Sequence, residues 1–259
     1  MTDPVHAPSE NSNTLTVNEE QYPEIIPILP IRNTVIFPST MIPISVGRES
    51  SKKLIDETAT GVRIVGCLFQ KDPDINNPGP DDLFPIGSIC RIHKMFQVPS
   101  GERNVVLQGL DRFRVVEYTG DDPYLSVRYE LLPQEGEVDI ATEAVINSIR
   151  QNAIKMINMS AGIPDEVAVI IQNITESTAL IDIIASNLNV SVEDKIKILG
   201  EVDFKSRCNM INAMLARELE MAELTKKIND QVKHTIDKTQ REYYLREPVS
   251  YTHLRAHET

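Results

Sequence analysis

The chain has 259 residues, of which 41% are hydrophobic, enough for one large or two modest packed domains. Its formal net charge of −12 disfavours contact with nucleic-acid phosphates, and no basic stripe offsets that charge. Cys67, Cys90 and Cys208 form no CxxC pair, which excludes the usual zinc and thioredoxin-like motifs. Because no apolar run reaches the roughly 20 residues of a spanning helix and no signal peptide is visible, we expect a cytoplasmic protein with reduced thiols and no membrane contact.

The first part of the chain has the pattern of strands. Residues 1–22 are polar and acidic and predict a disordered tail, after which 23–133 form a β-rich domain. Pro27 and Pro30 exclude a helix near the start of this domain. Strands are predicted over 24–32, 42–46, 62–70, 87–98, 103–109, 112–118 and 124–132, with one helix over 48–60. The short spacing of the turns predicts a curled antiparallel sheet.

The second part of the chain is helical, so the fold class is α+β. Residues 134–202 begin with a polar linker and predict a helical subdomain, with one helix near 140–160 and others starting at Pro164 and Ser191. From 203 to 247 there is no Gly or Pro, and apolar residues recur with a heptad rhythm, which predicts a long coiled-coil-like helix. Two shorter helices folded back on each other are the alternative, since helices average only about 12 residues.

Sequence motifs for catalysis are absent. The chain has no GxxxxGK[ST], GxGxxG or GxSxG motif, so neither a phosphate-binding loop nor a nucleophile elbow is visible. The cluster from Ser50 to Lys53 is assigned to a helix start, and His93 to a structural role in a strand. His253 and His257 stand four residues apart but have no third ligand. We therefore expect no catalytic, cofactor or metal site in this chain.

Four segments resemble the Lon family of ATP-dependent proteases: ILPIRNTVIFPSTMIPISVGRE (28–49), residues 80–115, KIKILGEVDFKSRCNMINAMLARELEM (195–221) and TQREYYLRE (239–247). The resemblance implies a region that recognises unfolded or degron-tagged proteins and helps to assemble a homohexamer. It also implies that an AAA+ ATPase module, with its ATP and Mg²⁺, and a protease domain with a Ser–Lys dyad would follow. The parent protein would then be a serine endopeptidase that degrades misfolded and short-lived regulatory proteins.

The end of the chain departs from this family. Residues 248–259 have no periodicity, and Pro248 is expected to stop the preceding helix, because proline inside a helix costs about 3 kcal/mol. We interpret this tail as the product of a frameshift or a chimeric junction, and the chain as truncated before the ATPase and protease modules. The alternative is a free-standing Lon-like domain that acts as an adaptor or scaffold.

Candidate substrate contacts follow from the expectation that unfolded proteins are caught by exposed apolar patches with a polar rim. The candidates are the apolar Pro38, Met41 and Ile42, the charged Arg48, Glu49 and Lys53, and Ser100 and Gly101 at a hairpin tip. Core packing is the alternative role for the three apolar residues. An unrecognised enzyme would instead show a concave pocket with perturbed titratable groups.

Overall fold

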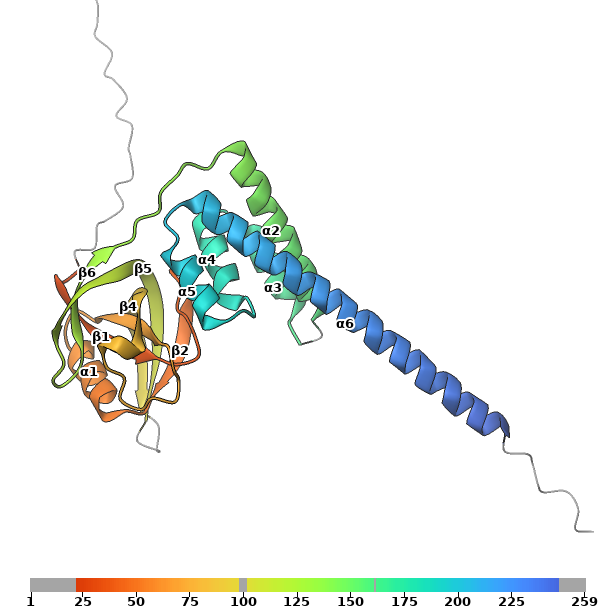
Figure 1. Cartoon of the computed structure of the whole chain (residues 1–259), viewed down its shortest axis with the longest axis horizontal. Coiled ribbons are helices and arrows are strands. Elements are labelled where there is room, and N and C mark those ends of the chain that lie inside the picture. Colours follow the sequence, from red (N-terminus) through yellow and green to blue (C-terminus); the bar gives the residue numbers. More distant parts are fainter. Residues whose placement is uncertain (1–21, 98–101, 161, 247–259) are drawn as a thin grey trace, which may run out of the picture.

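The computed structural model describes residues 22–97, 102–160 and 162–246. A β-rich part is followed by a group of helices, and one long helix extends away from both (Figure 1). Of the two predicted tails, 1–22 and 248–259, only Tyr22 falls within the described residues.

The described residues of the β-rich part form six strands and one α-helix. Its elements are β1 (Ile25–Ile31), β2 (Met41–Val46), α1 (Glu49–Ala59), β3 (Ile64–Gln70), the 3-10 turn η1 (Pro80–Asp82), β4 (Leu83–Gln97), β5 (Arg103–Gly120) and β6 (Ser126–Leu131). The sequence predicted two strands where the structure has the single strand β5. Gly109 does not break this strand; a Cβ there would lie 2.1 Å from the carbonyl oxygen of Phe37, so glycine allows the backbones to approach.

The strands form one mixed sheet in the order β2-β5-β4-β3-β1-β6, and a further pairing of β5 with β6 closes it into a barrel. The predicted antiparallel arrangement is wrong for one pair of strands, because β1 runs parallel to β3. Between them the chain passes through β2 and α1, and this crossover returns it in its original direction. The other strand pairs within the described residues are antiparallel.

Apolar side chains fill the barrel and continue beneath the helices. One buried cluster inside the barrel contains Ile26, Ile28, Leu68, Phe113 and Val127. A larger cluster joins β-rich residues such as Phe37 and Leu107 to helical residues such as Ile181 and Leu199. The three cysteines are buried and free, as the sequence predicted.

The helical part consists of α2 (Ile140–Met159), α3 (Asp165–Asn173), α4 (Ser177–Asn187), α5 (Val192–Gly200) and α6 (Phe204–Arg246). At Ser191, the predicted start of α5, the side chain accepts a hydrogen bond from the Asp194 N–H, as an N-cap does. The helix α6 is continuous over 43 residues, so the alternative of two folded-back helices is wrong. Its first turns pack against α2, α4 and α5. Over 204–236, where the burial of α6 is described, Leu219 is the last residue with a buried side chain, and beyond it α6 projects away (Figure 1).

A buried arginine joins the barrel to the helices. Arg112 of β5 donates hydrogen bonds to the carbonyl oxygens of Leu199 (3.0 Å), Glu201 (2.6 Å) and Pro133 (3.3 Å). Burial, with the nearby charge of Arg207, lowers the pKa of Arg112 to about 10, which leaves it charged at neutral pH. These carbonyls belong to the end of α5 and to the linker before α2, so one side chain fixes both to the barrel.

Candidate functional site

The barrel wall is incomplete between β1 and β2. The strand β6 pairs only with the first residues of β1, from Ile25 to Pro27. The Leu125 carbonyl still accepts a hydrogen bond from the Ile28 N–H at 2.8 Å. The preceding residues 121–124 form no backbone pair with β1. The second half of β1 therefore lacks a neighbouring strand on that side, and the gap is a cleft that β2 borders.

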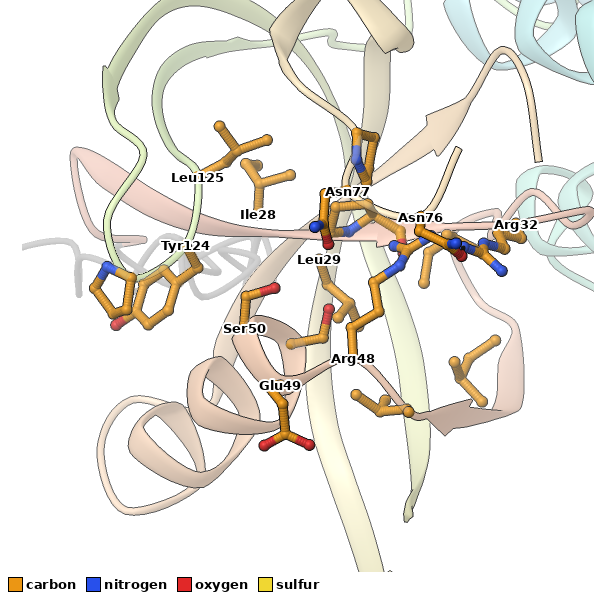
Figure 2. A pocket seen from close by; sticks show the side chains of 18 of the residues that line it. Ile28, Leu29, Arg32, Arg48, Glu49, Ser50, Asn76, Asn77, Tyr124 and Leu125 are labelled. Carbon is orange, nitrogen blue, oxygen red and sulfur yellow. Dashed lines mark hydrogen bonds between the residues drawn. The ribbon is translucent and has the colours of Figure 1, made fainter. Parts of the chain in front are cut away.

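The cleft has a volume of about 1070 Å³, the size of a binding site for a small molecule or a short peptide segment. Its walls are residues 28–32 of β1 and the loop after it, residues 43–47 of β2 and the loop after it, the first turn of α1, the loop 76–80, and residues 121 and 123–125. Figure 2 shows Tyr124 and Ser50 on one side of the cleft and the Arg48 side chain extending toward Asn76 and Arg32 on the other. Buried apolar side chains, including Leu29 and Val46, form part of the lining.

The charged groups at the cleft hold its walls together. Arg48 donates hydrogen bonds to the Pro30 carbonyl at 3.3 Å and to the Gln70 side chain, so it ties the start of α1 to β1 and β3. Arg32 contacts Gln70 and donates to the Asn76 side chain at 3.1 Å. Burial, with the charge of Arg32, lowers the pKa of Arg48. Arg48, a predicted substrate contact, therefore has much of its donor capacity engaged within the protein.

A second, more open cleft lies on the other side of the α1 N-terminus. Glu49, which also lines the first cleft, and Lys53 are the two other charged candidates; they line the second cleft together with Asp56 and Arg103. Arg103 makes a two-point ion pair with Asp56, with both distances 3.1 Å. Figure 2 shows Glu49 directed away from the other labelled side chains of the first cleft. The structure therefore brings Glu49 and Lys53 together on an exposed charged surface beside the first cleft.

The apolar candidates differ in their exposure. Pro38 is half-buried in the loop between β1 and β2, and Ile42 is half-buried against the main apolar cluster. Met41, at the start of β2, is 51% exposed and is the only one of the three that presents a largely free apolar side chain. Ser100 and Gly101 lie outside the described residues.

Sequence reasoning missed most of the cleft. The loops at 76–80 and 121–125 were interpreted only as turns, and β1 was interpreted as an extended segment. The useful signal was the concentration of Asn, Pro and Gly at 76–80, because loops of that composition often carry function. The sequence contains no signal for the early end of the β1–β6 pairing, which depends on where two distant segments separate.

Two titratable groups in the lining of the cleft have perturbed pKa values. Besides Arg48, the perturbed group in the lining is Tyr124, whose pKa is raised by its hydrogen bond to Glu57 (2.8 Å) and by burial. The lining also includes the exposed carboxylates of Glu49 and Asp121. Among the described residues, no three His, Cys, Asp or Glu side chains gather closely enough to bind a metal ion. Within the same ranges, no helix combines the length and apolar character needed to cross a bilayer.

Comparison with known proteins gives a consistent family. Residues 25–217 match the model of the ATP-dependent protease La (LON) substrate-binding domain. The chain is 35% identical over 230 residues to the Lon protease of Dictyoglomus thermophilum, an alignment that covers 89% of this chain and 29% of the relative. It is 37% identical over 229 residues to the Lon protease of Koribacter versatilis, covering 86% of this chain and 28% of the relative. The chain thus spans less than a third of the length of these relatives.

Two solved structures share the fold. The N-terminal domain of the Mycobacterium avium complex Lon protease superposes with a TM-score of 0.60 at 19% identity, covering 74% of this chain and 98% of that one. The Lon N-terminal domain protein from Xanthomonas campestris gives a TM-score of 0.54 at 15% identity, covering 73% and 97%. From the family model and the relatives above, the chain belongs to the family of substrate-binding domains of the ATP-dependent Lon proteases.

Proposed function

We propose that this chain binds unfolded or degron-tagged proteins and presents them for ATP-dependent proteolysis. The observation that carries this proposal is the cleft between β1 and β2, which lies within the part of the chain that matches a substrate-binding domain. Its lining combines buried apolar side chains with polar groups from four separate segments. Such a surface suits an unfolded chain, which exposes apolar side chains and free backbone groups together.

We further propose that hydrolysis of ATP and of peptide bonds takes place outside this chain. The AAA+ ATPase with its Mg²⁺ and the Ser–Lys protease are implied by the Lon relatives, of which this chain spans less than a third. The charged pair at the cleft, Arg32 and Arg48, supports binding and positioning and supplies no nucleophile. In this proposal the cytoplasmic protein as a whole is the enzyme, and this chain is its receptor for substrate.

Self-association into the homohexamer is part of the same proposal. Beyond Leu219, one face of α6 carries a stripe of exposed apolar side chains: Met221, Leu224, Ile228, Val232 and Ile236. These positions fall within about 120° on a helical wheel of 3.6 residues per turn, as in the seam of a coiled coil. The stripe supports contact with helices of neighbouring subunits, and it would account for a helix that continues far beyond its own domain.

The test of substrate binding is a titration of fluorescently labelled α-lactalbumin followed by anisotropy. The protein is offered either in its native form or after reduction and carboxymethylation, which leaves it permanently unfolded. We expect saturable binding of the unfolded form and no binding of the native form, with no ATP hydrolysis and no peptide cleavage by this chain. Equal affinity for both forms, or no binding of either, would contradict the proposed function.

A further inference from the structure

We propose that the bound segment lies in the cleft as an added β-strand, hydrogen-bonded through its backbone to the open edge of β2. This inference rests on the proposed function and specifies how the same site would hold its substrate. The occupant is an extended stretch of unfolded polypeptide, and the groups that recognise it are main-chain N–H and C=O groups of this chain.

The register of β2 against β5 determines which backbone groups face the cleft. Thr40, immediately before β2, accepts a hydrogen bond from the Gly109 N–H at 2.9 Å, and Ile42 stands opposite Leu107 two residues further on. In an antiparallel ladder, alternate residues direct both backbone groups to the partner strand. Thr40 and the even-numbered residues of β2 therefore face β5. The odd-numbered residues Met41, Pro43 and Ser45 direct their backbone groups away from β5.

Pro43 agrees with this assignment. A proline cannot donate to a ladder, so in a sheet it is tolerated where its nitrogen faces away from the neighbouring strand. Its place among the outward-facing residues leaves the N–H groups of Met41 and Ser45 and the carbonyl oxygens of all three residues on the free edge. Among the described residues, no hydrogen bond is recorded to any of these outward-facing backbone groups.

The cleft extends along this edge. Both β2 and β6 pair with the same side of β5, β2 with its first half and β6 with its second. The strand β6 continues on to β1, whereas β2 has the cleft on its far side. Consecutive residues of β2 from Pro43 to Val46 line the cleft, as expected where a strand is approached along its edge; one face of a strand would present only alternate residues.

The strand β1, which faces β2 across the cleft, cannot hydrogen-bond to the added strand at Pro30. Pro30 of β1 has no N–H, and its carbonyl oxygen already accepts a hydrogen bond from Arg48. An added strand would therefore bond to β2 on one side and rest against apolar side chains of β1, such as Leu29, on the other. Pairing through the backbone accepts almost any sequence, a useful property in a receptor for many unfolded proteins. Alternate side chains of the substrate would point into the cleft and provide modest selectivity.

The test removes one edge donor at a time. Ser45→Pro deletes an outward-facing N–H, and the neighbouring Pro43 shows that this edge accepts proline. Ser45→Ala is the matched control. Both variants lose the side-chain hydrogen bond to Glu102, but only the alanine variant keeps the backbone N–H. Met41→Pro against Met41→Ala gives a second pair. A melting temperature for each variant establishes that it is folded.

With unfolded, carboxymethylated α-lactalbumin as the probe, we expect each proline variant to bind about fivefold more weakly than its alanine control, which corresponds to one hydrogen bond of about 1 kcal/mol. The double proline variant should bind about 25-fold more weakly, because the two positions are far enough apart to act independently. A labelled octapeptide N-methylated at successive positions should lose affinity at every second position, and this measurement needs no variant of the protein.

If the wild-type chain binds the unfolded probe and each proline variant matches its alanine control, strand addition is overturned while the proposed function stands. Uniform sensitivity to N-methylation would overturn it in the same way. Loss of self-association in Ser45→Pro, with affinity for the probe unchanged, would assign the edge to a second copy of this chain and overturn the proposal. Failure of the wild-type chain to bind the probe would overturn both proposals.

Discussion

Replacement of Arg112 by Met tests whether a single buried side chain holds the barrel and the helices together. Arg112 is 5% exposed, and its guanidinium donates to three carbonyl oxygens, two at the end of α5 and one in the linker before α2. Methionine has a similar length and leaves these carbonyls without their charged donor. Since a hydrogen bond from a charged group contributes about 1.5 kcal/mol, the loss of three amounts to about 4.5 kcal/mol.

The assay is unfolding in urea followed by circular dichroism. At a slope of about 2 kcal/mol per M, a loss of about 4.5 kcal/mol lowers the midpoint by about 2 M. Arg114→Met is the matched control: Arg114 lies on the same strand, exposed, in an ion pair with Glu130 at 3.2 Å. Such a surface pair contributes at most about 1 kcal/mol.

Two further results follow if Arg112 joins the two parts. The urea midpoint of Arg112→Lys should lie between those of the wild type and the methionine variant, because lysine keeps the charge but lacks the planar guanidinium that reaches several carbonyls. Limited proteolysis of Arg112→Met should show new cleavage in the linker at 133–139. If the free energies of unfolding of Arg112→Met and the Arg114→Met control differ by less than about 1 kcal/mol, and no new cleavage appears, Arg112 does not hold the barrel and the helices together.

Two predictions concern other parts of the β-rich region. Reversing the charges of Glu49 and Lys53, both exposed beside the cleft, should weaken binding of unfolded α-lactalbumin a few-fold with an unchanged melting temperature; unchanged affinity would remove this surface from the site. Gly87→Ala should yield little folded protein, because the new Cβ would lie 2.2 Å from the Cys67 carbonyl oxygen, whereas Gly120→Ala, with no atom within 4 Å, should melt like the wild type. Equal melting temperatures for the two alanine variants would contradict the packing described for β4.

The positions of most elements could be predicted from local sequence patterns. Alternation in β2 and the near-continuous apolar run of β3 identify strands, and the long stretch without Gly or Pro identifies α6. These features depend on residues close together in sequence. The parallel pairing of β1 with β3 was not predicted, because it depends on the path of the chain through α1, which no local pattern describes.

The candidate site was only partly accessible to the same reasoning. The prediction of exposed apolar residues selected Met41, which is exposed, but also Ile42, which is half-buried against the main cluster. Arg48 was selected as a charged contact, yet its long side chain reaches across the cleft to β1 and β3. The type of residue was informative, but the role of Arg48 depends on partners 18 and 22 residues away in sequence.

The central claim is that unfolded polypeptide binds along the open edge of β2. Amide-resolved hydrogen exchange, measured by NMR with and without unfolded α-lactalbumin, tests it most directly. In the free protein the Met41 and Ser45 amides should exchange rapidly, while those of Ile42 and Ile44 are protected by the ladder to β5. On binding, Met41 and Ser45 should become protected. Protection that appears only on the helices, or no change at either β2 amide at saturation, would contradict the account.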